Sequence, residues 1–342
     1  MRIDRLKSLQ SVLEETSGRL EAGENAGAKV WPSGFGALDK ALGGGFRTGE
    51  LALLGSRPGL GKTTFALQVV RNLVASGHSA VYFSFEHDNH ALLERLIVLE
   101  AAQIAGPSAV RLTGVREAFD MPHGSEQMLE GRLADTEGGS EAVRALQKYA
   151  SRLHVHRSSG AETDVEAMTR AIYTIRENTD QTPFVVVDYL QKVHAVAASV
   201  DRRQPARLAE DDRVTMVVEG LKDMALDLSV PVLALAAVDK GGLAAATRTR
   251  AQDLSGPSAL AHEADVVLIL NNKFDVVARH HLMYNLANAA AFRAWVVMTI
   301  EKNRNGVDNL DLEFRKRFEQ SRFDTDGGRV AEELIDDRIF VE

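Results

Sequence analysis

The residues whose types and spacing most clearly suggest a chemical role lie in ELALLGSRPGLGKTTFALQVV, residues 50–70. An apolar run leads into a glycine-rich turn, and Gly61-Lys62-Thr63 then opens an amphipathic stretch of helical spacing. Successive backbone N–H groups at a helix N-terminus bind anions, and glycine lets the backbone come close to a phosphate. A lysine at this position reaches the outer phosphates of a nucleotide, and the Thr63 hydroxyl is placed for Mg²⁺. The spacing therefore predicts a P-loop that binds ATP together with Mg²⁺.

The match to the P-loop consensus G-x-x-x-x-G-K-[ST] departs at one position. Ser56 stands where the first glycine is usual, with Gly55 directly before it. The expected strand and helix on either side still fit a phosphate-binding turn, and a glycine-rich turn without a nucleotide is the alternative. The residues predicted to bind the nucleotide are Ser56, Arg57, Pro58, Gly59, Leu60, Gly61, Lys62, Thr63, Thr64 and Asp188.

Two acidic residues end apolar runs and complete the predicted site. Asp188 closes the run in PFVVVDY, residues 183–189, and a carboxylate in that position is costly unless it faces a site. We expect Asp188 to hold the metal together with Thr63, with a strand-end cap as the alternative. Glu86 closes AVYFSFE and is predicted to act as a general base or to position the attacking water. A solvated carboxylate is the alternative for Glu86.

Six apolar runs alternate with helical stretches and must position these residues. Near-continuous apolar strands separated by helices are typical of a parallel sheet that is buried on both faces. The predicted fold class is α/β, with a largely parallel central sheet flanked by helices. One helix is expected to begin at Thr163, with Glu166 in capping-box spacing. The runs cover residues 50–55, 80–85, 183–189, 230–237, 264–270 and 294–300, and the surface excursions predicted between elements cover 106–140, 195–212 and 239–258.

The N-terminal residues form a separate unit in this interpretation. Residues 1–22 carry apolar side chains at helical spacing, and EAGENAGAKVWPSG then breaks the pattern. We therefore divide the chain into an N-terminal helix and linker, residues 1–30, and a nucleotide-binding ATPase domain, residues 31–342. The apolar face of the helix is expected to dock either on its own domain or on a neighbouring subunit. That face comprises Ile3, Leu6, Leu9, Leu13 and Leu20.

The composition excludes several classes of protein. The 342 residues include no cysteine, which excludes disulfides, thiolate metal sites and cysteine nucleophiles. The apolar runs are far shorter than the roughly 18 residues of a membrane span, and the charged N-terminus lacks a secretory signal. We expect a cytoplasmic protein without membrane contact. The formal charge of −8 provides no general attraction to nucleic acid, so such a contact needs local basic patches.

Four segments carry a resemblance to a known family: residues 34–68, VYFSFEH at 81–87, VVVDYLQ at 185–191 and residues 300–324. In this order they resemble the ATPase domain of the replicative DNA helicase (DnaB) family, within the RecA-like superfamily, over about residues 30–325. The resemblance implies a RecA-like P-loop NTPase core. It also implies an ATP-hydrolysing helicase or translocase that acts on single-stranded DNA as a hexameric ring.

The resemblance assigns roles to individual residues. Lys62 is the P-loop lysine, Glu86 corresponds to the family's catalytic base, and Asp188 corresponds to its Walker B aspartate. Lys302 and Arg304 lie in KNRNG and correspond to residues that reach the γ-phosphate of the neighbouring subunit. Residues 1–30 are similar to the family's linker helix, which packs on the next protomer of the ring.

The sequence departs from the family pattern in two respects. The family's N-terminal domain, which binds primase, has no counterpart here, so we expect a different, unidentified recruiting protein. The family also has Ser-Gln after the strand at 230–236, whereas Ala236 and Ala237 stand here. Since that glutamine senses the γ-phosphate and couples it to DNA, we expect DNA to stimulate hydrolysis only weakly. The alternative function is a RecA-like ATPase of the RadA or KaiC type, used as a nucleotide switch or scaffold for a partner without unwinding.

Contact with a single strand requires lysine or arginine on loops that face it. The candidates are Arg202, Arg203 and Arg207 in one excursion, and Lys240, Arg248 and Arg250 in another. Solvated loop cations are the alternative for both groups. The basic segment EFRKRFEQSRF, residues 313–323, is predicted to be an edge hairpin with solvated charges, and a nucleic-acid patch is the alternative. The histidine pairs lack the carboxylates of a metal site, so we expect no structural metal.

Overall fold

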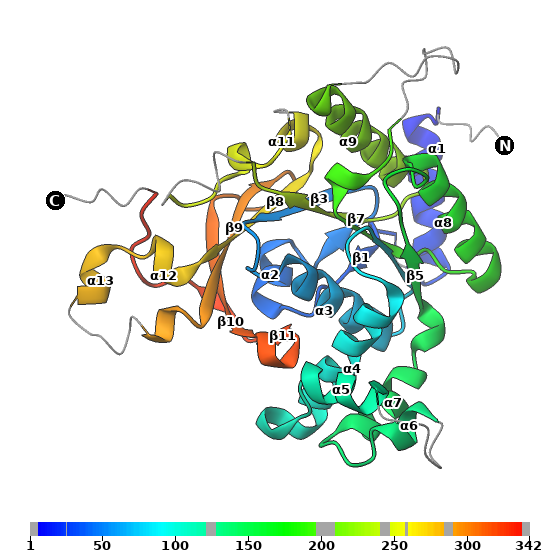
Figure 1. Ribbon diagram of the computed structural model, residues 1–342. Helices are drawn as coiled ribbons and strands as arrows, with labels where there is room; N and C mark the ends of the chain where they lie inside the picture. Colours follow the sequence, from blue (N-terminus) through cyan, green and yellow to red (C-terminus); the bar gives the residue numbers. More distant parts are fainter. Residues whose placement is uncertain are drawn as a thin grey trace.

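The computed structural model describes residues 6–24, 26–120, 128–195, 209–239, 247–256, 259–283 and 290–336. Its centre is a large sheet with helices on both faces (Figure 1). The strands follow one another across this sheet in the order β11-β10-β9-β8-β3-β7-β6-β4-β5. The α/β fold class predicted from the apolar runs is confirmed.

Six parallel strands make up the larger part of the sheet. They are β3 (Leu51–Ser56), β4 (Ala80–Ser84), β5 (Leu153–Arg157), β6 (Phe184–Asp188), β7 (Val232–Ala237) and β8 (Val266–Asn272). β3 lies between β7 and β8, and all six of its residues are buried. Since parallel strands point the same way, their carboxyl ends share one edge of the sheet. That edge is where the predicted site residues follow β3, β4 and β6.

The sheet continues beyond β8 with antiparallel strands. These are β9 (Trp295–Asn303), β10 (Leu310–Arg317) and β11 (Arg322–Phe323), and β12 (Gly328–Arg329) also pairs with β10. A separate two-stranded sheet joins β1 (Val30–Trp31) to β2 (Phe46–Arg47), with α2 (Gly36–Ala41) between them in the sequence.

Two hydrophobic clusters fill the two faces of the sheet. Residues of α3 (Lys62–Ala75) and α4 (Asn89–Ala105) belong to one cluster, and residues of α8 (Val165–Thr179), α9 (Glu210–Asp227) and α11 (Ala259–Glu263) belong to the other. α8 begins slightly later than predicted, because Asp164 is its N-cap and accepts a hydrogen bond from the N–H of Ala167 at 2.7 Å. No helix among the described residues is long and apolar enough to cross a bilayer.

The prediction of a surface excursion over residues 106–140 is wrong for its described part. The chain there forms α5 (Leu112–Asp120), α6 (Leu129–Arg132) and the start of α7 (Gly139–Gln147), and α5 and α7 pack against α4. Val115, Leu133 and Val143 are buried in this layer. The segment is rich in glycine and acidic residues, but Val110, Val115 and Leu133 belong to the same hydrophobic cluster as the buried residues of α4.

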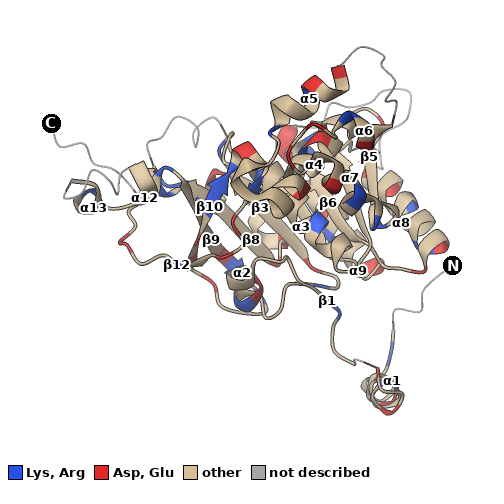
Figure 2. Ribbon diagram, turned by 90° about the horizontal axis from the view of Figure 1, so that it is seen from below, with Lys and Arg blue, Asp and Glu red and all other residues tan. Residues whose placement is uncertain are grey.

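The N-terminal helix α1 (Leu9–Glu21) projects from the body of the protein (Figure 2). Ser8 caps it by accepting a hydrogen bond from the N–H of Ser11 at 3.1 Å. None of its residues is buried, and Leu6, Leu9, Leu13 and Leu20 are between 59% and 87% exposed. Ile3, which was predicted to share this face, lies outside the described residues. The apolar face of α1 therefore has no cover within the described part of its own chain.

Candidate active site

The turn at residues 57–61 joins the buried end of β3 to the first residue of α3. Gly59 and Gly61 have φ angles of +78° and +91°, in the left-handed region that favours glycine. A Cβ atom on Gly61 would also lie 2.7 Å from ring atoms of Phe318 and Phe323. The first helical residues, Lys62, Thr63 and Thr64, line a cavity of about 440 Å³. The N-terminus of α3 thus presents its unpaired N–H groups and positive dipole to this space.

The Lys62 ammonium is held at the turn by Ser56. Its Nζ donates to the backbone oxygen of Ser56 at 2.8 Å and contacts the Ser56 hydroxyl at 3.1 Å. Burial lowers the pKa of Lys62, while the negative charges of Asp188 and Glu86 act in the opposite direction. Ser56, the departure from the consensus, therefore supplies a side-chain contact to Lys62 that a glycine could not make.

Asp188 and Thr63 meet across the cavity as the sequence predicts. Asp188 is the last residue of β6 and only 2% exposed. Its Oδ2 accepts hydrogen bonds from the Thr63 hydroxyl at 2.9 Å and from the Tyr82 phenol at 2.7 Å. Burial raises the pKa of Asp188, and the two hydrogen bonds lower it. This pair places hydroxyl and carboxylate oxygens together, the kind of ligand that Mg²⁺ prefers.

Most of the predicted nucleotide residues line the same cavity. These are Pro58, Gly59, Gly61, Lys62, Thr63, Thr64 and Asp188, together with Glu86. Ser56 is fully buried behind the turn. Arg57 points elsewhere, since its Nη2 donates to the backbone oxygen of Thr247 at 2.9 Å. Neither Arg57 nor Leu60 is part of the cavity wall.

Further residues contribute to the site although the sequence analysis did not assign them to it, and His87 and Tyr189 on the cavity wall are two of them. Tyr82 bonds Asp188 from the neighbouring strand β4, and Arg95 of α4 lines the cavity. Phe318 also lines it, is 39% exposed, and packs edge-to-face on Phe323. The segment 313–323 lies at an edge of the sheet as predicted, but Phe318 faces the cavity as well as solvent. Gln68 of α3 fixes this position by exchanging two hydrogen bonds with the backbone of Phe323, at 2.8 and 2.9 Å.

Ala237 lines the cavity at the end of β7, where the sequence analysis noted a missing glutamine. A different glutamine, Gln191, contacts the backbone there: its Oε1 accepts from the N–H of Ala237 at 3.1 Å. Its Nε2 donates to the backbone oxygen of Ser255 at 2.9 Å. Gln191 lies in the 3-10 helix Leu190–Lys192 that follows Asp188. The end of β6, the end of β7 and the segment around Ser255 are therefore joined through one side chain.

Lys302 and Arg304 do not reach this cavity. Val266 of β8 lies opposite Asn303 of β9 on one side and Ala52 of β3 on the other. Asn303 therefore lies level with Ala52, which is four residues, or about 13 Å, before the carboxyl end of β3 at Ser56. Lys302 donates to the backbone oxygens of Ala261 and His262 at 2.7 and 3.0 Å.

Arg304 pairs with Asp265 at 3.2 Å and donates to the backbone oxygen of His262 at 2.6 Å. Its side chain is still 47% exposed, so the guanidinium is accessible at the surface. Both Lys302 and Arg304 lie near the end of the sheet opposite their own P-loop.

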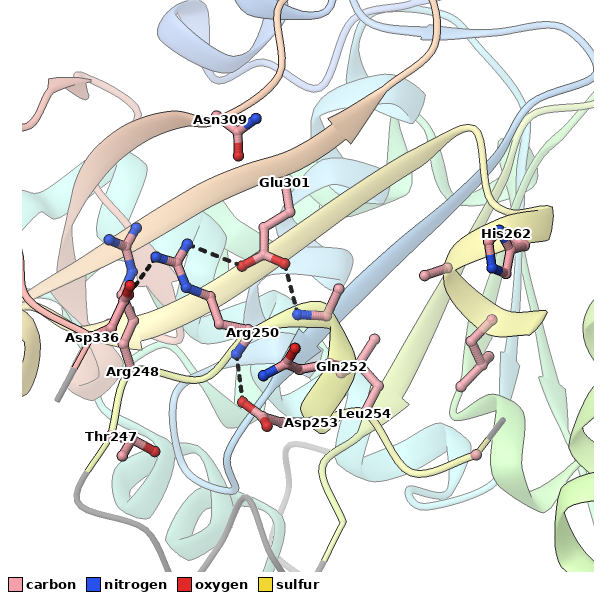
Figure 3. A pocket seen from close by; sticks show the side chains of 14 residues that line it. Thr247, Arg248, Arg250, Gln252, Asp253, Leu254, His262, Glu301, Asn309 and Asp336 are labelled. Atoms are coloured by element: carbon pink, nitrogen blue, oxygen red, sulfur yellow. Dashed lines mark hydrogen bonds and ion pairs between the residues drawn. The ribbon is translucent and has the colours of Figure 1, made fainter. Parts of the chain in front are cut away.

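The two described arginines predicted to contact DNA in the second excursion, Arg248 and Arg250, have partners within the fold, and Figure 3 shows those of Arg250. Arg248 is only 6% exposed; it forms an ion pair with Asp311 and donates to the Thr299 hydroxyl at 2.7 Å. The expectation of an exposed loop position is wrong for Arg248, because Asp311 of β10 and Thr299 of β9 bind its guanidinium within the fold.

Arg250 pairs with Glu301, at 3.3 Å, and with Asp336. It lies on the wall of a second cavity of about 830 Å³. Arg202, Arg203, Arg207 and Lys240 lie outside the described residues, and their contact with DNA stays a prediction.

The parallel sheet, the glycine turn before α3 and the acidic residues after β4 and β6 together define a RecA-like P-loop NTPase fold. Residues 31–324 match the family model of the DnaB-like helicase C terminal domain. The chain therefore belongs to the DnaB-like helicase family, as the sequence resemblance predicted.

Relatives in this family are replicative DNA helicases DnaB from several bacteria. The chain is 29% identical over 326 residues to the protein from Pasteurella multocida, covering 93% of this chain and 61% of the relative. It is 28% identical over 320 residues to the protein from Haemophilus influenzae, covering 92% of this chain and 59% of the relative. The chain thus spans about three fifths of the length of these relatives.

Solved structures share the fold at lower sequence identity. One of them, described as an ATPase domain, superposes with a TM-score of 0.69 at 21% identity, covering 93% of this chain and 98% of that one. A DnaB-like replicative helicase, described with its primase interactions, gives a TM-score of 0.68 at 21% identity over 94% of this chain and 68% of that one.

Proposed function

We propose that the chain is an ATP-hydrolysing motor of the DnaB type, which acts in the cytoplasm on single-stranded DNA as a hexameric ring. The observation that carries this proposal is the convergence of Lys62, Thr63 and Asp188 on one cavity, with Glu86 on its wall. Family membership supports the same conclusion.

The residues of the cavity fit ATP and Mg²⁺. The N–H groups of α3 and the Lys62 ammonium bind phosphate oxygens, and the Phe318 ring at the mouth offers a face to the base. The Thr63 and Asp188 oxygens hold the metal, which when bound neutralises negative charge on the phosphates. Glu86 takes the proton of the attacking water as the general base.

Hydrolysis in this proposal needs a second subunit. Arg304 lies at the far end of the sheet from its own P-loop, so it stabilises the charge on the γ-phosphate of the neighbouring subunit, with Lys302 beside it. The exposed apolar face of α1 packs on the next protomer and supports the ring.

A nucleotide switch or scaffold for a partner protein is the second candidate function. Ala237 favours it, because a methyl group at the end of β7 cannot hydrogen-bond a phosphate. The ion pairs of Arg248 and Arg250 favour it as well, since both guanidinium groups already have carboxylate partners. In this case the ATP-bound ring is the output, and no strand is displaced.

One set of measurements separates the two functions. ATP turnover is measured with and without single-stranded DNA, next to salt-dependent DNA binding and strand displacement on a forked duplex. Glu86→Gln is expected to lower turnover by about 10²–10⁴-fold while it retains nucleotide. A motor shows salt-sensitive DNA binding and displaces a strand, even though we expect stimulation of turnover below about tenfold. Turnover without DNA binding supports the switch, and the absence of any turnover in the wild type overturns the ATPase assignment.

A further inference from the structure

The Tyr82 phenol is the only tyrosine hydroxyl among the described residues that bonds a carboxylate of the candidate site. Tyr82 lies on β4 opposite Val186 of β6, and Asp188 follows two residues later on the same face of the sheet. The ring is fully buried, and its hydroxyl donates to Asp188 Oδ2 at 2.7 Å. The strand register thus directs a buried donor onto the carboxylate that faces the cavity.

The same oxygen of Asp188 accepts two hydrogen bonds, one from Tyr82 and one from Thr63. Two donors on Oδ2 fix the rotation of the carboxylate about its last bond and leave Oδ1 as its freer oxygen. Burial and the neighbouring Asp188 charge hold the pKa of Tyr82 well above its ordinary value, so the phenol stays a donor.

We infer that Tyr82 is a positioning residue of the metal–nucleotide site. Its phenol orients Asp188 so that one carboxylate oxygen is available to the Mg²⁺ that binds with the nucleotide. This inference rests on the proposed function, because it takes Asp188 as the residue that serves Mg²⁺. A purely structural role for Tyr82 would require only its ring, which packs in the hydrophobic cluster below α3 and α4. The hydroxyl is the part that separates the two roles.

The test compares Tyr82→Phe with Tyr149→Phe. Tyr149 is a matched control, because its buried hydroxyl donates to another buried carboxylate, Glu100, away from the cavity. Binding of a fluorescent ATP analogue is titrated with Mg²⁺ at one fixed pH, and the melting temperature of each variant is recorded.

We expect Tyr82→Phe to raise the Mg²⁺ concentration for half-maximal binding by about tenfold, the effect of one hydrogen bond to a charged group. Tyr149→Phe should lower the melting temperature without changing the Mg²⁺ requirement. If Tyr82→Phe does not fold, Tyr82→Met, which fills the space without a donor, takes its place and is held to the same outcome.

A wild-type Mg²⁺ requirement in the Tyr82 variant overturns the inference and leaves the proposed function standing. Equal shifts in both tyrosine variants overturn it too, since they indicate a general loss of stability. A wild-type protein whose nucleotide binding ignores Mg²⁺ overturns both the inference and the metal site of the proposed function.

Discussion

Replacing Arg304 by alanine should separate catalysis from folding. The ion pair of Arg304 with Asp265 is 3.2 Å long, and its arginine side chain is 47% exposed. Pairs of this kind contribute about 0.2–1 kcal/mol to the free energy of unfolding. Asp265 keeps two other partners, Lys222 Nζ at 2.7 Å and the N–H of Leu51 at 2.8 Å, so its buried carboxylate is not left unpaired. The melting temperature should therefore fall by about 2 °C or less.

The catalytic loss should be far larger. An arginine that stabilises the transferring phosphate from a neighbouring subunit is worth about 10³–10⁵ in rate, or about 4–7 kcal/mol in activation free energy. We expect Arg304→Ala to bind nucleotide normally and to lose turnover by at least 10³-fold. Arg170→Ala is the matched control, because Arg170 forms an exposed pair with Glu166 at 2.9 Å remote from the cavity.

The assay is steady-state ATP turnover at several protein concentrations, with thermal unfolding recorded for each variant. Mixing Arg304→Ala with Lys62→Ala should restore part of the activity, because each subunit supplies what the other lacks. Turnover of Arg304→Ala within tenfold of the wild type would refute the reasoning. The same holds for a specific activity that does not change when the wild type is diluted to monomers.

Three other outcomes follow from the structure. Lys62→Ala should abolish turnover and most nucleotide affinity in calorimetry, since it removes the only described cation that is hydrogen-bonded to the end of β3; unchanged affinity would contradict the site. Phe318→Ala should weaken ATP binding by about tenfold but leave tripolyphosphate binding unchanged, as expected for an aromatic contact to the base. Deleting residues 1–22 should lower the assembly mass in light scattering at an unchanged melting temperature, because α1 has no buried residue, whereas an unchanged mass would argue against α1 as a subunit contact.

The glycine turn and its acidic partners were predictable because their signals are local. A glycine turn between a buried strand and a helix, and an acid at the end of a second buried strand, come to the same edge when the strands are parallel, and here β7 alone separates β3 from β6. The sequence reading placed Asp188 with Thr63 on this basis, and the structure brings their oxygens to 2.9 Å. The fold class followed from the same apolar runs.

The contacts that were missed depend on pairing between distant segments. Tyr82 reaches Asp188 only because Tyr82 is in register with Val186, and no feature of AVYFSFE fixes that register. Phe318 reaches the P-loop because the β10–β11 turn packs on α3. Gln68 of α3 holds this turn through a hydrogen bond to Phe323, which lies 255 residues later in the sequence. Arg248 follows a glycine- and alanine-rich stretch typical of a surface loop, and its burial is created by Asp311 on β10.

The hydrogen bonds of Gln191 bear on how this protein tolerates sequence change. Its amide contacts only backbone atoms of Ala237 and Ser255, so the connection does not depend on which side chains those two positions carry. Substitutions at positions 237 and 255 that leave the backbone in place therefore keep these hydrogen bonds. A substitution at position 191 that removes the whole amide breaks the bonds to both segments at once.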